Sequence, residues 1–211
     1  AKKRSRRRVH ISFDEWNVWN QSASRTAPNW VKAPALLEDS YTFRDMLVVG
    51  GMLNTLLNHC NVVKAGCLAQ LVNGIAPSIT QNGGGVLRQT IFYPFRYASR
   101  FGRGETVRTF SDSARFENMH GRARVINEAV AHNAVRREVC AFLCNYSESA
   151  ETVVLELRDF GDLRCAEFVS MESADLDARN TFKQGEKVAP VQKAPVPVKG
   201  GAAEVQLAPM S

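Results

Sequence analysis

Two stretches in the first half of the chain have the apolar pattern of β-strands. Residues 8–13 alternate between apolar and polar positions, which predicts a strand that ends at Asp14 and Glu15. Residues 62–69 are almost continuously apolar, which is typical of a strand that is covered on both faces in a parallel sheet. The Ser-, Pro- and Asn-rich residues 21–34 between these strands predict a loop.

Apolar residues recur at helical spacing over residues 43–57 and predict the first helix. Asp39 or Ser40 is the expected N-cap, because short polar side chains accept hydrogen bonds from the first free backbone amides. Gly50 and Gly51 lie in the middle of this helix, where glycine is costly. We therefore expect the helix to pack closely against a neighbour at that point.

The chain changes character near residue 104. Before it, a second helix is expected from Pro94 to a stop at Gly102, so the order is strand, helix, strand, helix, as in a β/α-barrel or a doubly wound sheet. After it the apolar period falls to two, which predicts an antiparallel β-sandwich. The boundaries expected are therefore 1–104 for an α/β part and 105–211 for an all-β part. The strands expected in the second part are residues 122–132, 136–146, 151–158, 164–172 and 203–207.

Composition indicates an ordinary globular protein, with 45% hydrophobic and 23% charged residues and no apolar run long enough for a membrane span. The net charge of +6 comes from residues 1–8, which hold six of the 27 basic residues. The other 21 basic residues balance the 21 acidic ones. The basic run is either a solvated segment or a phosphate-binding arm. No nucleic-acid-binding motif accompanies it, so neither a nucleic-acid nor a membrane partner is expected.

The five cysteines and four histidines do not predict a metal site. The cysteines are odd in number, form no C-x-x-C pair and lie in apolar runs, so they are expected to be free thiols in the core. The histidines lack metal-ligand spacing. Neither a metal nor an organic cofactor is expected.

The segment Phe13-Asp14-Glu15-Trp16-Asn17-Val18-Trp19 is the strongest candidate for chemistry. Two adjacent carboxylates at a strand end beside tryptophans are typical of a sugar-binding catalytic edge, because the carboxyl ends of barrel strands carry catalytic groups. The alternative is that Glu15 pairs with an arginine and that the tryptophans fill the core.

Four blocks in this order resemble the α-L-arabinofuranosidases of glycoside hydrolase family 51. They are ISFDEWNVW at 11–19, LVVGGMLNTL at 47–56, CLAQLVN with IAP at 67–77, and RQTIFYPF at 88–95. Similar stretches follow at 130–133 and 175–182. The resemblance implies that the chain holds the last two β/α units of a (β/α)8 barrel, with strands seven and eight, followed by a jelly-roll-like antiparallel β-sandwich without its last strand. It also implies a partner, the N-terminal part of the barrel, because a whole barrel needs about 250 residues.

The resemblance implies a retaining hydrolase that releases terminal α-L-arabinofuranosyl groups from arabinan- or arabinoxylan-type substrates. Glu15 corresponds to the nucleophile, Trp19 to a wall of the sugar pocket and Gln70 to a hydrogen-bond partner of the sugar. The family's acid/base glutamate follows an asparagine at the end of barrel strand four, which this chain lacks. The pair Asn127-Glu128 lies in the expected sandwich and cannot replace it.

A second hypothesis is that the chain alone is catalytically silent and acts as a carbohydrate-binding or protein-interaction module. For the complete protein, the resemblance implies a homo-oligomer and a cytoplasmic location, with any export signal lying before this chain.

Overall fold

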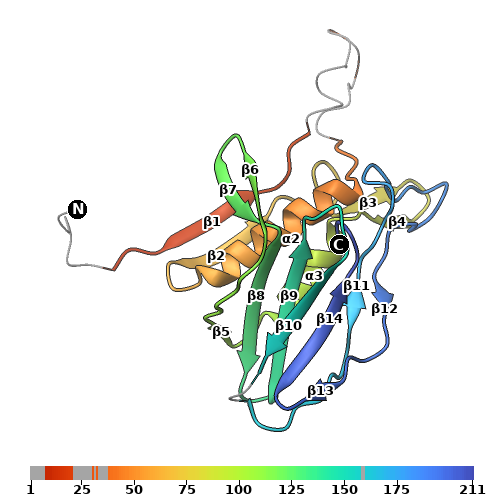
Figure 1. The fold of residues 1–211 in the computed structure, drawn as a ribbon. Helices are drawn as coiled ribbons and strands as arrows, with labels where there is room; N and C mark the ends of the chain where they lie inside the picture. Colours follow the sequence, from red (N-terminus) through yellow and green to blue (C-terminus); the bar gives the residue numbers. More distant parts are fainter. Residues whose placement is uncertain (1–7, 21–29, 31, 33–37, 158–159) are drawn as a thin grey trace.

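The computed structural model describes residues 8–20, 30, 32, 38–157 and 160–211. Residues 1–7 of the basic run at 1–8, and most of the expected loop at 21–34, lie outside these residues. A parallel pair of strands, a pair of helices and a set of antiparallel sheets form successive layers (Figure 1). The predicted change from α/β to antiparallel order is confirmed. The exact boundary at residue 104, between the second of these helices and the first strand that follows, stays a prediction.

Strands β1 (Ile11–Trp16) and β2 (Val63–Leu68) are parallel neighbours. Strand β1 begins at Ile11, later than predicted, and runs through Glu15 to Trp16. Trp16 pairs with Leu68 in register, so both strands end at the same edge of the sheet.

The prediction that residues 62–69 are covered on both faces is wrong for this structure. Strand β2 contains both half-buried and exposed residues, and Gly66 and Cys67 are among the exposed ones. The helix layer covers one face, where Trp16 belongs to a core with Leu68 packed against it. Within the described residues no second layer covers the opposite face, and no other strand pairs with either outer edge.

Helix α2 (Phe43–Asn58) matches the predicted helix, but its N-cap is Thr42 rather than Asp39 or Ser40. Thr42 and Asp45 form a capping box. The Asp45 amide donates to Thr42 Oγ1 at 3.3 Å, and the Thr42 amide donates to Asp45 Oδ2 at 2.8 Å. Asp39 accepts the Asn20 amide instead, at 2.9 Å.

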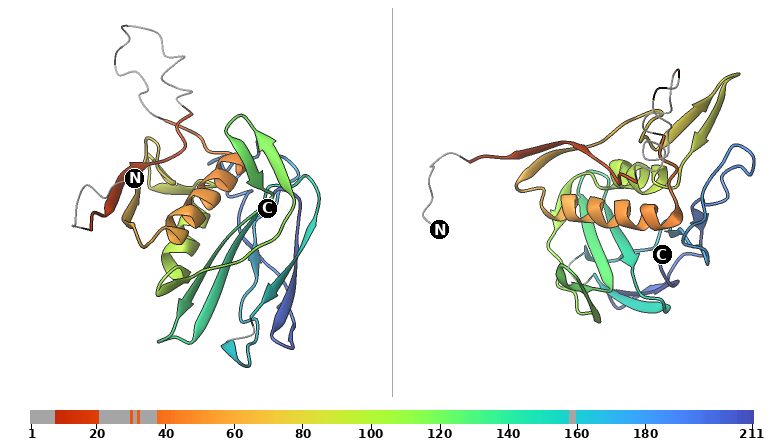
Figure 2. Two further views of the ribbon diagram at one scale, coloured as in Figure 1. Left: turned by 60° about the vertical axis from the view of Figure 1, so that its left-hand side comes forward. Right: turned by 90° about the horizontal axis from the view of Figure 1, so that it is seen from above.

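The expected close packing at Gly50 and Gly51 is confirmed. A Cβ atom on Gly50 would lie 3.1 Å from the Cys144 sulfur, and one on Gly51 would collide with the Tyr146 hydroxyl. Both partners belong to the sandwich side of the molecule. Helix α2 therefore lies between the parallel strands and the sandwich (Figure 2).

The segment after β2 holds a hairpin that the sequence patterns did not predict. Strands β3 (Ser78–Gln81) and β4 (Gly85–Arg88) flank a turn with positive φ at Gly83 and Gly84, where only a loop was expected. Helix α3 (Phe92–Phe101) starts two residues before Pro94 and ends at Gly102 as predicted. 

The C-terminal part is a β-sandwich, as predicted. One sheet has the order β5-β8-β9 and the other β10-β14-β13, and Ile126, Val205 and Leu207 form the core between them. The elements are β5 (Glu105–Val107), β6 (Arg115–Asn118), β7 (Gly121–Arg124), β8 (Ile126–Asn133), β9 (Glu138–Asn145), β10 (Glu151–Glu156), β11 (Val169–Ser170), β12 (Val191–Gln192), β13 (Val198–Lys199) and β14 (Ala202–Leu207).

The expectation that the cysteines are core residues is only partly correct. All five thiols are free, but Cys144 alone is fully buried, and Cys60 and Cys67 are exposed. Cys67 lies on β2, which is exposed for the reason given above, and Cys60 follows the end of α2.

Candidate active site at the end of the parallel strands

The structure brings Glu15 and Gln70 to neighbouring strand ends. Glu15 is the second-last residue of β1, and Gln70 lies two residues beyond β2. The Ala69 amide donates to the Trp16 carbonyl oxygen at 3.0 Å, so the parallel pairing continues to this point. In β/α proteins this carboxyl edge is where catalytic side chains gather.

All three predicted site residues are accessible. Trp19 is 49% exposed, and Glu15 and Gln70 are also exposed. Within the described part of the chain, none of the three side chains makes a hydrogen bond or an ion pair, so the alternative of a Glu15–arginine pair is not seen there. Their polar atoms are available to a ligand. Trp16, in contrast, is a core residue, as the alternative interpretation proposed for the tryptophans.

Asn17 connects the segments that follow the two strands. Its Nδ2 donates to the carbonyl oxygens of Ala69, at 2.7 Å, and of Ile75. Its Oδ1 accepts the Val18 amide at 2.8 Å. The sequence patterns gave Asn17 no role of its own. Its position just after a strand, between Trp16 and Trp19, was the available indication that this polar side chain has a specific partner.

Tyr41 adds a second connection and is a site residue that the sequence patterns missed. Its hydroxyl lies 2.9 Å from the Val18 carbonyl oxygen and 3.0 Å from the Ile75 carbonyl oxygen, so its single proton is shared between these two acceptors. Burial, helped by the carboxylates of Asp39 and Asp45, raises the pKa of Tyr41 far above its usual value. The phenol therefore stays protonated and remains a donor.

The buried side-chain amide of Gln89 also supports this arrangement. Gln89 accepts the Tyr41 amide at 2.9 Å and donates to the carbonyl oxygens of Ala76, at 2.8 Å, and Asp39, at 3.2 Å. The Asn20 side chain also donates to Asp45, at 3.3 Å. The buried Gln89 amide is therefore paired with backbone groups on both its oxygen and its nitrogen, as buried polar groups need to be.

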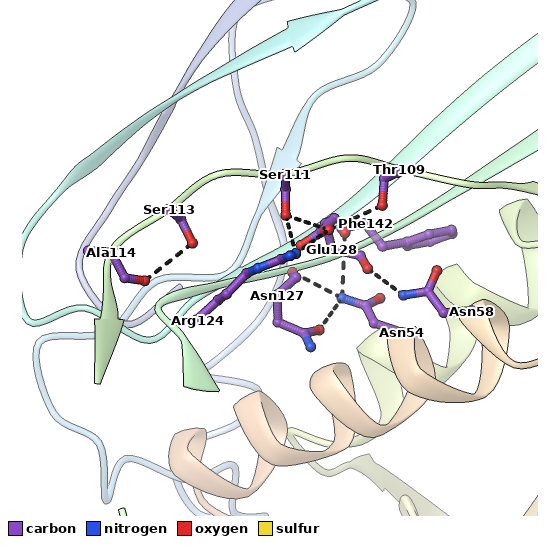
Figure 3. Close-up of polar contacts among 10 residues, drawn as sticks. All are labelled: Asn54, Asn58, Thr109, Ser111, Ser113, Ala114, Arg124, Asn127, Glu128 and Phe142. Carbon is purple, nitrogen blue, oxygen red and sulfur yellow. Dashed lines mark hydrogen bonds and ion pairs between the residues drawn. The ribbon is translucent and has the colours of Figure 1, made fainter. Parts of the chain in front are cut away.

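The Asn127-Glu128 pair lies on β8, where both side chains form polar contacts with neighbouring residues (Figure 3). The Glu128 carboxylate accepts hydrogen bonds from Ser111 at 2.7 Å and Thr109 at 3.1 Å, and lies 3.4 Å from Arg124. These contacts fix the segment between β5 and β6 to the sandwich. As expected, the pair lies on a strand of the sandwich.

Neither a metal cluster nor a membrane-spanning helix is found among the described residues. These residues contain no group of three or more His, Cys, Asp and Glu side chains arranged to hold a metal ion. No helix among them combines the length and the apolar character that a membrane span requires.

Comparison with known proteins decides the family. The model of the α-L-arabinofuranosidase C-terminal domain matches residues 14–211. The chain belongs to the α-L-arabinofuranosidases of glycoside hydrolase family 51. This confirms the resemblance carried by the four sequence blocks, and it matches the parallel strands from residue 14 on, together with the sandwich, to the C-terminal domain of this family.

The relatives of this family 51 chain carry the name arabinofuranosidase. It is 42% identical over 198 residues to an intracellular exo-α-(1→5)-L-arabinofuranosidase of Acetivibrio thermocellus, covering 90% of this chain and 39% of that protein. It is 39% identical to the enzyme of the same name from Halalkalibacterium halodurans, covering 100% and 43%. The chain thus spans about two fifths of the relatives that it matches.

A solved structure agrees with the family assignment and with the predicted fold class. The family 51 α-L-arabinofuranosidase from Bifidobacterium longum superposes with a TM-score of 0.83 at 30% identity, over 95% of this chain and 40% of that one. The enzyme from Thermotoga petrophila superposes with a TM-score of 0.77 and has the same fold.

Proposed function

We propose that this chain carries the nucleophile side of the active site of a retaining, exo-acting α-L-arabinofuranosidase. The supporting observation is the position of Glu15, whose accessible carboxylate lies at the carboxyl end of β1, beside the end of β2 that leads to Gln70. The names of the relatives support the activity.

In this mechanism Glu15 attacks the anomeric carbon of the sugar while the bond to the leaving oxygen breaks. A second carboxylic acid gives its proton to that oxygen, and a covalent glycosyl-enzyme remains. The second carboxyl group, now a carboxylate, then takes a proton from a water molecule. That water attacks the anomeric carbon and releases Glu15. The two carboxyl groups of retaining enzymes lie about 5–5.5 Å apart. We place the acid/base glutamate in the part of the enzyme outside this chain.

Trp19 and Gln70 are proposed to bind the sugar next to Glu15. The exposed indole of Trp19 offers an apolar face for the furanose ring. The Gln70 amide can both donate to and accept from sugar hydroxyls. Carboxylates suffice for the nucleophilic and acid–base steps, so the proposal needs no cofactor.

The proposed substrates are arabinan- or arabinoxylan-type oligo- and polysaccharides that end in α-L-arabinofuranosyl groups. Several relatives are named as intracellular, which supports a cytoplasmic enzyme acting on small oligosaccharides. A homo-oligomer of the complete protein is part of the same proposal.

Replacement of Glu15 by Ala in the complete enzyme tests the nucleophile assignment. Turnover of 4-nitrophenyl α-L-arabinofuranoside should fall on the order of 10⁴–10⁶-fold, as expected when a nucleophile is removed. Azide should restore part of the rate, because a small anion can attack from the vacated space. The matched control is Asp14→Asn, since the neighbouring Asp14 carboxylate already accepts the Ser12 hydroxyl. Normal turnover by the Glu15→Ala enzyme would refute the proposal.

The second candidate function, a catalytically silent module, applies to the 211-residue chain on its own. The uncovered face of β2 and the unpaired outer edges of β1 and β2 in the described residues favour it. We expect the purified chain to show no hydrolysis of the aryl arabinofuranoside. Turnover by this chain alone would show that it supplies its own acid.

A further inference from the structure

The three proposed site residues lie on chain segments that are held together by one side-chain amide. Asn17 is two residues after Glu15. It accepts from Val18, the neighbour of Trp19, and donates to Ala69, the neighbour of Gln70.

The Asn17 amide has no spare hydrogen-bonding group for a ligand on its donor side. An asparagine side chain has two N–H donors, and here both go to backbone carbonyl oxygens, those of Ala69 and Ile75. Its oxygen accepts the Val18 amide at 2.8 Å. Three contacts in three directions fix the rotation of this side chain, and with it the relative position of the two strand ends.

Tyr41 closes the same connection from the helix side. Its hydroxyl donates to the carbonyl oxygens of Val18 and Ile75, which are residues that Asn17 also contacts. Tyr41 is fully buried and immediately precedes Thr42, the N-cap of α2. The strand ends are therefore fixed to the rigid start of a helix as well as to each other.

We infer that Asn17 is a positioning residue for the hydrolysis, which sets the placement of Glu15 relative to Gln70 without touching the substrate. The inference rests on the proposed function. Aspartate has the same shape but cannot donate to the two carbonyl oxygens, and it would place another negative charge two residues from the nucleophile. Catalytic groups that are misplaced by about 1 Å can lose about 10²-fold in rate.

The test compares two asparagines that donate to backbone carbonyl oxygens, in the complete enzyme with 4-nitrophenyl α-L-arabinofuranoside as substrate. Asn17→Ala should lower kcat about 10²-fold, with KM changed only a few-fold, because bond making depends on geometry more than sugar binding does. Asn54→Ala is the matched control. Asn54 also donates from Nδ2 to backbone carbonyl oxygens, but these belong to Asn127 and Phe142 in the sandwich and not to the segments that follow β1 and β2.

The control separates a positioning role from a general loss of stability. Asn54→Ala should lower the thermal unfolding midpoint by at least as much as Asn17→Ala and keep kcat within a few-fold of the unmodified enzyme. Equal losses of kcat in the two variants, or an unchanged kcat in folded Asn17→Ala, would overturn the inference. If Asn17→Ala does not fold, Asn17→Asp decides by the same comparison. Failure of both to fold while Asn54→Ala folds would assign Asn17 a purely structural role.

Glu15→Ala is measured alongside, so that the two proposals fail separately. Full activity of Glu15→Ala removes the proposed function and the inference that rests on it. An inactive Glu15→Ala together with a normal Asn17→Ala removes only the role of Asn17.

Discussion

The hydroxyl group of Tyr146 occupies the space that a side chain at Gly51 would need. The same hydroxyl donates to the Leu47 carbonyl oxygen at 3.3 Å, one turn earlier in α2. Tyr146 follows β9 directly, so this contact brings the backbone of the helix close to the end of a sandwich strand. Only a residue without a Cβ atom permits that approach.

Gly51→Ala should destabilise the protein although alanine is the better helix former. The helical gain is about 1 kcal/mol, whereas forcing an extra carbon into a packed contact costs about 1–3 kcal/mol. We expect the upper part of that range, because the added atom meets the Tyr146 hydroxyl directly. The measurement is the midpoint of urea unfolding. Adding Tyr146→Phe should recover part of the loss, and an unchanged midpoint for Gly51→Ala would contradict the argument.

Asn54→Ala should lower the free energy of unfolding by about 1–3 kcal/mol, which is typical when buried polar groups lose their partners. Asn54 is 2% exposed, and its Nδ2 lies 2.9 Å from the Asn127 side-chain oxygen and 3.3 Å from the Asn127 carbonyl oxygen. Asn58 provides the control on the same helix. Its side chain donates to the Glu128 carbonyl oxygen at 2.7 Å but is exposed, so water can replace the lost hydrogen bond. Equal effects of Asn54→Ala and Asn58→Ala in thermal unfolding would contradict the role of burial.

Periodicity predicted the long elements well, because their burial is regular. Helix α2 and the strands β8 and β9 each present one apolar side to the same interface. Their apolar residues therefore recur in the sequence with the period of a helix or a strand. The N-cap was misassigned because Asp39, Ser40 and Thr42 are all suitable residue types within four positions, and only backbone geometry selects Thr42. The β3–β4 hairpin has mostly half-buried or exposed residues, so its alternation left no apolar signal.

The stability conferred by Glu186 should depend on pH. Its carboxylate accepts hydrogen bonds from Arg88 at 2.5 Å and from the buried Tyr93 hydroxyl at 2.8 Å, tying the β3–β4 hairpin and α3 to the sandwich side. Partial burial alone would raise the pKa of Glu186, but these hydrogen bonds outweigh it and lower the pKa below its usual value of about 4.5. A carboxyl group with a lowered pKa stabilises the fold above its unfolded-state pKa, and that stability is lost as the pH falls through the folded-state pKa.

Glu186→Gln therefore should lower the thermal midpoint clearly at pH 7, and the difference from the unmodified protein should shrink below about pH 4.5. The control is Glu138→Gln. Glu138 forms an exposed pair with Arg136 at 3.9 Å, which should contribute little at any pH. A Glu186→Gln difference that grows on acidification would show that the sign of this argument is wrong.

Cys144 should be inert toward alkylating reagents in the folded protein, and Cys60 should react. Burial raises the pKa of the Cys144 thiol to about 12, and only the thiolate is a nucleophile. Cys60 is exposed at the end of α2. Iodoacetamide labelling followed by mass spectrometry should find Cys60 modified before Cys144, and addition of urea should remove the difference. Rapid native labelling of Cys144 would mean that the contact between α2 and the sandwich opens readily.

The sequence was enough to single out the candidate site residues, but not the contacts that hold them in place. Glu15 and Trp19 stand in a short run of unusual residue types, so local composition was enough to single them out. Tyr41 and Gln89 act through backbone groups of segments far away in sequence, such as Ile75 and Ala76. Contacts of that kind arise from tertiary structure and leave no repeating pattern in the chain.

Helix α2 begins beside Tyr41 at the strand ends, and its Phe43 and Arg44 amides donate to the carbonyl oxygens of Ala178, at 2.8 Å, and Leu176, at 2.9 Å, in the C-terminal part. The sandwich is thus bonded to the turn of helix that supports the strand ends. It follows that the two parts are not exchangeable modules. A chimera joined at residue 104 would have to take both partners of this helix, the strand ends and the sandwich, from one parent. Shuffling that separates them would yield chains that keep Glu15 but displace the strand end that carries it.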